Sequence, residues 1–164
     1  ALNRAVLSEG RLGQFLTGIY ARLRARPDGA FAVTLACGGH PPPVVLRADG
    51  AAGPLECSGT LLGVLEDPHL EESEAILAPG DTLMLYTDGM TEAAAPERTM
   101  SAAEVADLLR AARASRARDT ASDALAAVAR MAGGALRDDV AVLVAQALST
   151  EGRTAAGESS TRGQ

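Results

Sequence analysis

Two aspartates that adjoin apolar runs are the residues best placed for chemistry. Asp88 follows the apolar run 82–87 and precedes Gly89, while Asp138 stands just ahead of the apolar run 140–147. A carboxylate at the end of a buried strand is costly unless a cation or hydrogen-bond donors meet it. If the two runs form neighbouring antiparallel strands, the end of one lies beside the start of the other and the carboxylates converge. Such oxygen ligands suit Mg²⁺ or Mn²⁺ better than zinc.

Each aspartate also has a purely structural interpretation. An Asp-Gly pair is common in turns, so Asp88 can simply cap one, and Asp138 with the aspartate after it can form an exposed loop. Thr87 and Thr91 flank Asp88, where they either hydrogen-bond its carboxylate or are ordinary residues at a strand end. The sequence contains no Ser-His-Asp or Cys-His pattern that would indicate a nucleophilic enzyme.

The two histidines and two cysteines do not extend this set. His40 stands among prolines and is interpreted as a turn residue, whereas His69 lies among acidic residues and is predicted to be solvated. Cys37 and Cys57 are too few and too far apart for a zinc site. We expect two reduced, partly buried thiols, since a disulfide would require their strands to be neighbours.

The length and composition predict one domain, without the basic clusters of a nucleic-acid-binding protein or the long apolar runs of a membrane-spanning one. The chain has 164 residues, 47% of them hydrophobic, and a net charge of -6, with no lysine or arginine cluster that would bind a nucleic-acid backbone. No apolar run is long enough to span a bilayer. The first four residues contain neither an initiator Met nor a signal-peptide pattern, so we expect a cytoplasmic protein and a fragment of a longer one.

Alternating and continuous apolar runs predict a chain rich in strands. The expected strands cover residues 15–26, 30–37, 44–47, 55–57, 70–77, 82–87 and 140–147. Pro27-Asp28-Gly29 has the residue types of a tight turn, so the first two strands are predicted to form a hairpin. The run 82–87 is apolar on both sides, which is typical of a strand buried on both faces.

Helices are predicted at the start of the chain and again late in it. One covers residues 2–9, another begins at a capping box made by Ser101 and Glu104, and a third covers about 120–131. The third is expected to end at Gly133-Gly134 and to turn inward Leu125, Val128 and Ala129. Since strands and helices do not alternate, we expect a mostly antiparallel α+β layered domain. Residues 149–164 are predicted to be a disordered tail.

Four segments of the chain, in order, form a set of motifs: residues 39–50 (GHPPPVVLRADG), 62–64 (LGV), 77–93 (LAPGDTLMLYTDGMTEA) and 137–144 (RDDVAVLV). They resemble motifs of the SpoIIE/RsbU-type phosphatases, which are bacterial members of the PPM, or protein phosphatase 2C-like, superfamily. Residues 39–50 (GHPPPVVLRADG) resemble the family's GHPPxxLxRxDG, and residues 62–64 resemble part of its PLGV segment. Residues 77–93 resemble LxPGDxLxLYTDGVTEA, and residues 137–144 resemble a segment that contains DDVTLLV. The resemblance extends from Leu2 to about Ala145.

The resemblance implies a layered α-β-β-α sandwich of two antiparallel sheets flanked by helices, truncated at the N-terminus. Residues 1–148 would be the C-terminal portion of the phosphatase domain. Asp88 and Asp138 match two metal-ligand positions and would be catalytic, at a site for two Mn²⁺ or Mg²⁺ ions. The implied reaction is attack of a metal-activated water on phosphoserine or phosphothreonine, which requires no nucleophilic side chain.

The chain also departs from the family pattern. Ala141 stands where the family usually has Thr, and Cys37-Gly38 stands where it usually has a small residue after Asn. The family's earlier acidic segments, Gly-Asp and Asp-x-Ser-Gly-His-Gly, are absent from this sequence. Because hydrolysis of a phosphate monoester requires a very large acceleration, we expect these residues alone to be a weak or inactive phosphatase.

The resemblance further implies a phosphorylated regulatory protein as substrate, of the anti-sigma-factor antagonist type, and permits an upstream sensor domain. One alternative is a non-catalytic PPM-fold module that binds or regulates. A second is a nucleotide hydrolase in which Leu83–Asp88 is a Walker-B-like strand, but the sequence contains no Gly-x-x-x-x-Gly-Lys-Ser/Thr loop.

Overall fold

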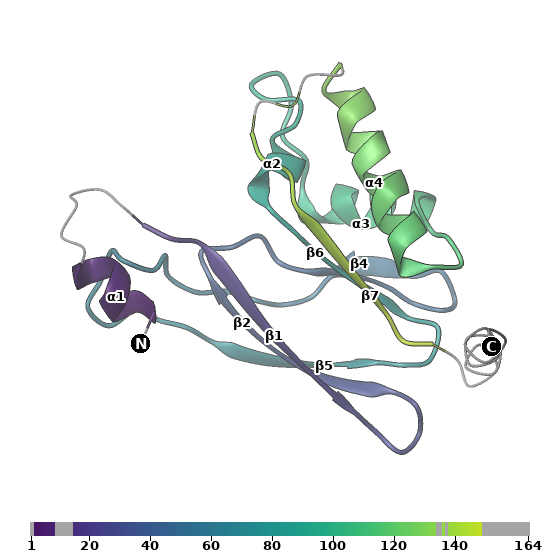
Figure 1. Ribbon diagram of the computed structural model, residues 1–164, viewed down its shortest axis with the longest axis horizontal. Helices are drawn as coiled ribbons and strands as arrows, with labels where there is room; N and C mark the ends of the chain where they lie inside the picture. The colour runs from purple at the N-terminus through teal and green to yellow at the C-terminus, as the bar shows by residue number, and fades with distance from the viewer. Residues whose placement is uncertain (1, 9–14, 134–135, 137, 149–164) are drawn as a thin grey trace, which may run out of the picture.

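The protein is a sandwich of two antiparallel sheets with helices outside one of them (Figure 1). The computed structural model describes residues 2–8, 15–133, 136 and 138–148. The tail predicted over 149–164 lies outside these residues. One sheet has the order β1-β2-β5 and the other β4-β3-β6-β7, and every neighbouring pair is antiparallel. This arrangement confirms the expected α+β architecture.

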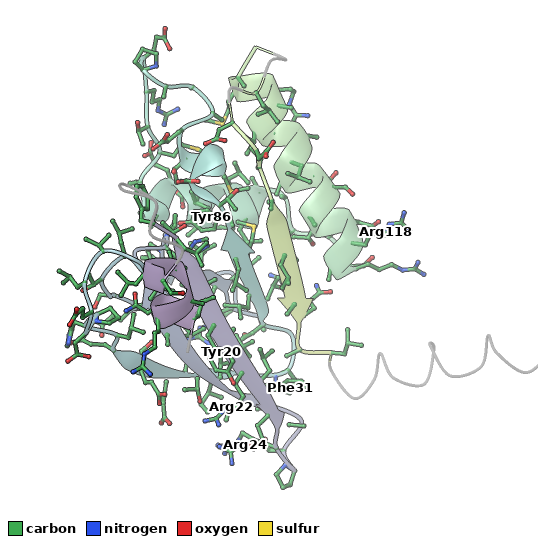
Figure 2. The ribbon with its side chains drawn as sticks, turned by 60° about the vertical axis from the view of Figure 1, so that its left-hand side comes forward. Tyr20, Arg22, Arg24, Phe31, Tyr86 and Arg118 are labelled. Atoms are coloured by element: carbon green, nitrogen blue, oxygen red, sulfur yellow. A yellow bond between two sulfur atoms is a disulfide. The ribbon has the colours of Figure 1, made fainter. Side chains whose placement is uncertain are left out.

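The three-stranded sheet begins with the predicted hairpin. Its strands are β1 (Gly18–Ala25), β2 (Phe31–Gly38) and β5 (Glu72–Leu77). The hairpin turn is stabilised by the Asp28 carboxylate, which accepts a hydrogen bond of 3.1 Å from the backbone N–H of Ala30. Gly29 adopts a φ of 81°, the conformation that favours glycine. Figure 2 shows Tyr20, Arg22 and Arg24 along β1 on the outer face of this sheet.

The four-stranded sheet lies between two hydrophobic cores. It contains β4 (Ala52–Pro54), β3 (Val44–Leu46), β6 (Thr82–Tyr86) and β7 (Val142–Gln146). Leu83 of β6 packs into the core shared with the three-stranded sheet, whereas Met84 packs into the core beneath the helices. Both side chains are buried, which confirms that β6 is covered on both faces.

The helices are α1 (Leu2–Ser8), α2 (Asp88–Thr91), α3 (Ala102–Ala111) and α4 (Ala117–Met131). Helices α3 and α4 cover the outside of the four-stranded sheet, where α3 contacts β3 and β4 and α4 contacts β7 (Figure 1). The predicted capping box opens α3, since the Ser101 side chain accepts from the Glu104 N–H and the Glu104 side chain accepts from the Ser101 N–H. None of the described helices is both long and apolar enough to cross a membrane.

Three elements of the structure differ from the prediction. The strand expected at 55–57 lies at Ala52–Pro54. The chain turns tightly after β3, where the Arg47 N–H donates to the Ala51 carbonyl (2.7 Å), and therefore pairs with β3 again from Ala52 onward. Helix α4 buries Thr120, Ala124 and Val128, so Val128 is inward as expected but Leu125 remains 36% exposed. Helix α2 was not predicted, because one helical turn is too short to show a periodic pattern.

The expectation of two reduced thiols is wrong. Cys37 and Cys57 form a disulfide, with their Cα atoms 5.6 Å apart. The two segments are neighbours because the chain after Cys57 returns along the end of β2, where the Gly39 N–H donates to the Gly59 carbonyl (3.0 Å). Gly59 is required there, since a Cβ atom at this position would collide with the Cys37 carbonyl oxygen.

Candidate metal site at one end of the four-stranded sheet

The pairing of β6 with β7 brings the two aspartate segments together. Tyr86 is the register partner of Val142, and beyond this pair the Thr87 N–H donates to the Ala141 carbonyl at 3.1 Å. Asp88 directly follows Thr87 at the end of β6, and Asp138 lies three residues before Ala141, ahead of β7. Both aspartates therefore lie at the same end of the four-stranded sheet, where Asp88 is the first residue of α2.

Thr87 joins the two segments through its hydroxyl group. Its Oγ1 atom donates to the backbone carbonyl of Asp139 (3.1 Å) and accepts from the N–H of Ala141 (2.9 Å). Thr91 donates to the backbone carbonyl of Asp88 at 2.8 Å. Neither threonine hydrogen-bonds the Asp88 carboxylate, so both act on the backbone that positions the site.

Gly89 permits the close approach of the two segments. It is buried, and a Cβ atom placed on it would lie 2.5 Å from the Asp139 carbonyl oxygen and 3.3 Å from a methyl group of Val140. Since a side chain at this position would push the Asp138 segment away, the glycine sets the separation of the two aspartates. The glycine of the Asp88-Gly89 pair is therefore needed for this contact between segments as well as for the turn.

The two carboxylates are exposed and make only local hydrogen bonds. Asp88 accepts from the N–H of Gly89 (3.1 Å), and Asp138 accepts from the N–H of Asp139 (2.7 Å). This leaves carboxylate oxygens free for a hard cation, so the donor set fits Mn²⁺ or Mg²⁺ in kind. Among residues 2–8, 15–133, 136 and 138–148, however, no three His, Cys, Asp or Glu side chains form a group able to hold a metal ion.

His40 lies at this same end, which sequence reasoning missed. The segment 39–43 crosses from β2 to β3, and β3 enters the four-stranded sheet with Val44 opposite Met84. Burial lowers the pKa of His40 below its usual value, whereas the charge of Asp88 and the backbone carbonyl of Tyr86 act in the opposite direction. The other histidine, His69, is exposed and bonded to Glu71 (3.1 Å), in agreement with its predicted solvation.

Two charged residues of the motif segments, Arg47 and Asp81, form a structural ion pair. Asp81 is 2% exposed and accepts three hydrogen bonds, from Arg47 Nη1 (2.8 Å), the Ala48 N–H (2.9 Å) and the Ala78 N–H (2.9 Å). Because Thr82 pairs with Leu46 where β6 begins, this ion pair lies at the end of the sheet opposite Asp88. It joins the turn after β3 to the turn before β6.

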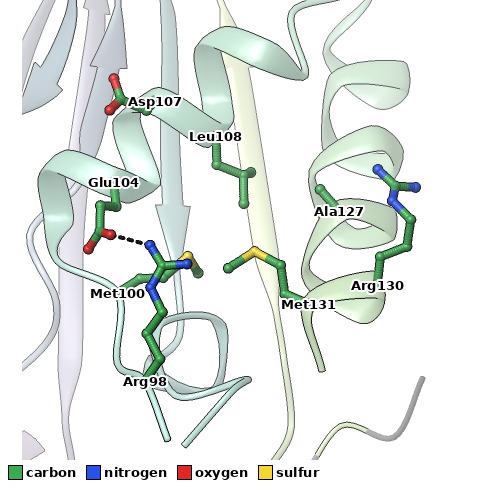
Figure 3. A pocket seen from close by; sticks show the side chains of 8 residues that line it. All are labelled: Arg98, Met100, Glu104, Asp107, Leu108, Ala127, Arg130 and Met131. Atoms are coloured by element: carbon green, nitrogen blue, oxygen red, sulfur yellow. Dashed lines mark hydrogen bonds and ion pairs between the residues drawn. The ribbon is translucent and has the colours of Figure 1, made fainter. Parts of the chain in front are cut away.

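A separate cleft lies among the helices, and neither Asp88 nor Asp138 lines it (Figure 3). It has a volume of about 660 Å³ and contains the ion pair between Arg98 and Glu104 and the two thioethers of Met100 and Met131. It contains none of the predicted site residues, and its lining holds charges of both signs. We therefore assign the candidate site to the end of the sheet and not to this cleft.

Comparison with known families identifies the chain. The model of the family described as Stage II sporulation protein E (SpoIIE) matches residues 1–148. The chain belongs to the SpoIIE family. The matched residues include both aspartate segments of the candidate site.

Solved structures related to the SpoIIE family share the fold. The RsbU and RsbW domains of a Mycobacterium tuberculosis protein match with 28% identity and a TM-score of 0.65, over 90% of this chain and 40% of that chain. The SpoIIE phosphatase domain of Bacillus subtilis, presoaked with Mn, matches with 16% identity and a TM-score of 0.61, over 80% of this chain and 57% of that chain. The present chain thus spans about half of these structures.

A third structure contains metal. The catalytic domain of the serine/threonine protein phosphatase PstP, in complex with two manganese ions, matches with 17% identity and a TM-score of 0.60, over 90% of this chain and 67% of that chain. The comparison with curated proteins finds no match. The shared architecture confirms the two-sheet sandwich with flanking helices that the sequence predicted.

Proposed function

We propose that this chain is part of a metal-dependent protein serine/threonine phosphatase, with residues 1–148 forming the C-terminal portion of the catalytic domain. The observation that carries the proposal is the meeting of the Asp88 and Asp138 segments at one end of the β6–β7 pair. Both carboxylates are exposed and keep oxygens free for a hard cation. Membership of the SpoIIE family supports the same assignment.

In this proposal the side chains of Asp88 and Asp138 hold Mn²⁺ or Mg²⁺, two ions in the complete domain. Such ions supply an activated water and neutralise charge on the transferring phosphoryl group. Thr87 and Gly89 keep the two aspartate segments together, through the hydroxyl bridge to Asp139 and through the absence of a side chain. Because the described residues contain no group of three possible ligands, the remaining ligands must come from outside them.

We further propose that the substrate is a phosphorylated regulatory protein of the anti-sigma-factor antagonist type and that the enzyme acts in signal transduction. The matched Mycobacterium tuberculosis structure, which joins RsbU and RsbW domains, supports a regulatory setting. The disulfide between Cys37 and Cys57 argues against the cytoplasm, where disulfides are rare. Assay of the purified protein against phosphoserine and phosphothreonine proteins tests the substrate class.

The second candidate function is a non-catalytic PPM-fold module that binds a partner. The observation in its favour is that the described residues hold only part of a metal-ligand set. Measurement of phosphoserine hydrolysis by the full-length protein distinguishes the two candidates. A protein that binds Mn²⁺ but hydrolyses no phosphoserine substrate would support the binding module.

The decisive variant is Asp88→Asn in the full-length protein. An amide keeps the shape of the side chain and its turn hydrogen bond but binds Mn²⁺ poorly, so turnover should fall at least tenfold and recover in part at high Mn²⁺. The matched control is Asp49→Asn, which changes another Asp-Gly pair whose carboxylate accepts only from the Ala51 N–H (2.9 Å). The melting temperature without metal should be little changed in both variants.

Near-wild-type turnover of Asp88→Asn at limiting Mn²⁺ would show that Asp88 is only a turn residue. A fall in turnover accompanied by a clear drop in the melting temperature measured without metal would assign the effect to folding. That result would also count against the proposal. The control variant should retain full activity in either case, because its turn accepts asparagine equally well.

A further inference from the structure

A short segment of the chain, residues 56–60, is inserted at one end of the three-stranded sheet. Strands β2 and β5 pair directly over most of their length, and beyond the last pair this segment lies between the two chains. On the side of β2 it is held by the disulfide between Cys37 and Cys57 and by the hydrogen bond from the Gly39 N–H to the Gly59 carbonyl. The disulfide is therefore the covalent tie between β2 and the inserted segment.

The inserted segment also has contacts that involve neither sulfur atom. On the side of β5, the Thr60 N–H donates to the His69 carbonyl at 2.7 Å, and the Ser73 hydroxyl donates to the Glu56 carbonyl at 2.6 Å. Together with the hydrogen bond from Gly39, these contacts hold the segment on both sides. The sulfur–sulfur bond can therefore open and close again while the segment stays in place.

The two cysteines differ in their access to solvent. Cys37 borders a cleft beside α1, but only 1% of the residue is exposed. Cys57 is half-buried and lines an open cleft of about 630 Å³. In thiol–disulfide exchange a thiolate must approach one of the two sulfurs from outside, so access decides which sulfur is attacked. The structure favours attack at Cys57, with Cys37 as the leaving group.

The cleft beside the disulfide is acidic. Its lining includes three exposed glutamates, Glu56, Glu71 and Glu72, and none of the described residues that line it is basic. A hydrogen bond with His69 is the main cause that lowers the pKa of Glu71, so this carboxylate is charged at neutral pH. A cleft lined by one sign of charge attracts small molecules of the opposite sign and repels those of the same sign. An anionic thiol should therefore enter slowly and a cationic thiol quickly.

We propose that Cys57 is a thiol-exchange site, at which a small thiol that carries an ammonium group opens the disulfide. The thiolate of the small molecule attacks the Sγ atom of Cys57 and forms a mixed disulfide with it. The electron pair of the sulfur–sulfur bond leaves with Cys37, whose thiolate takes up a proton. A second small thiol then attacks the small-molecule sulfur of the mixed disulfide, which leaves Cys57 as a thiol.

The two steps balance, since two small thiols are oxidised to one disulfide and supply the two electrons that reduce the protein. In the reverse direction, the small disulfide reacts with Cys57 and the Cys37 thiolate expels the small thiol. Opening the bond removes the covalent tie between β2 and the loop that contains β3 and β4. The exchange requires no metal at Asp88, so it is independent of the proposed function.

The first test identifies the sulfur that is attacked in the full-length protein. The protein is treated briefly with cysteamine, quenched with acid and digested with trypsin, and the peptides are mapped by mass spectrometry. Cleavage after Arg47 separates the two cysteines. We expect the cysteamine adduct on Cys57. An adduct on Cys37, or an equal division between the two, would overturn the inference.

The second test varies the charge of the thiol. The disulfide is opened with cysteamine, 2-mercaptoethanol or glutathione, which carry an ammonium group, no charged group and a net negative charge respectively. The same reactions in urea give the intrinsic reactivity of each thiol. Relative to the unfolded protein, the folded protein should favour cysteamine over glutathione by about tenfold more, and added salt should reduce this preference. An equal preference in the folded and unfolded protein would refute the role of the acidic cleft.

Charge variants separate electrostatics from the size of the thiol. Glu56→Gln combined with Glu72→Gln should remove most of the preference for cysteamine. Glu97→Gln is the matched control, because Glu97 is exposed and does not line this cleft, and it should keep the preference of the wild type. A preference that survives in the double variant would show that size and not charge selects the thiol, which contradicts the proposal.

Variants that keep a single cysteine test access directly. In folded Cys37→Ala, the remaining Cys57 should form a mixed disulfide with cystamine, the disulfide of cysteamine, about tenfold faster than Cys37 does in folded Cys57→Ala. In urea the two rates should converge. Equal rates in the folded variants would refute the assignment of Cys57. If either variant fails to fold, the position of the adduct in the wild type decides the question.

Discussion

The buried carboxylate of Asp81 allows a quantitative prediction. Replacement by Ala removes the partner of Arg47 and leaves the N–H groups of Ala48 and Ala78 without their acceptor. Breaking a buried ion pair costs roughly 3–5 kcal/mol. A fully buried donor left unpaired costs about 1–3 kcal/mol, and the two N–H groups add less than this because they are only partly buried. These contributions overlap, and the Arg47 side chain is 37% exposed, so water recovers part of its hydration. We expect a loss of about 3–4 kcal/mol for Asp81→Ala.

Urea unfolding followed by far-UV circular dichroism measures this loss. With an m-value of about 2 kcal/mol/M, the urea midpoint should fall by roughly 1.5–2 M while the slope stays constant. Asp49→Ala is the control, since Asp49 lies in an exposed turn and accepts a single hydrogen bond from Ala51. Its midpoint should shift by less than about 0.5 M, in keeping with an effect of less than 1 kcal/mol.

The result that refutes this reasoning is an Asp81→Ala midpoint within about 0.5 M of the wild type. Such a result would mean that water replaces the carboxylate at no cost, and that the contact between Arg47 and Asp81 contributes nothing to the joining of the two turns. A changed slope would instead indicate that the variant alters the unfolded state.

Three further predictions concern the site, the disulfide and acid stability. Gly89→Ala should lower turnover of the full-length protein at least tenfold, since its Cβ would lie 2.5 Å from the Asp139 carbonyl; unchanged turnover would mean that the two segments need not touch. Reduction of the bond between Cys37 and Cys57, which are 20 residues apart, should cost about 3 kcal/mol in urea unfolding; a Cys57→Ser variant should be insensitive to the reductant, and an unchanged wild-type midpoint would contradict the prediction. A hydrogen bond from the backbone N–H of the helix cap, aided by a neighbouring arginine, lowers the pKa of Glu104 from 4.5 to about 2. Its stabilisation is therefore complete above pH 4.5 and lost as the pH falls toward 2; the stability difference between the wild type and Glu104→Gln should shrink over that range, and a constant difference would refute the assignment.

The sequence by itself determined the features that depend on local pattern. The two-sided apolar run of β6 required burial on both faces, and Ser101 with Glu104 specified the start of α3, because periodicity and capping act over a few residues. The hairpin between β1 and β2 likewise followed from its turn residues. The motif order was enough to place Asp88 and Asp138 in one family pattern, although their metal role stays a proposal.

Only the tertiary structure decided which distant side chains meet. The disulfide, the ion pair between Arg47 and Asp81, and the position of His40 beside the Asp88 segment all join residues that are 20 or more positions apart. Such contacts depend on strand order and register, and a local pattern does not encode them. The inward face of α4 was predicted only in part for the same reason: Val128 is buried as expected, but packing against β7 buries Ala124 and leaves the larger Leu125 exposed.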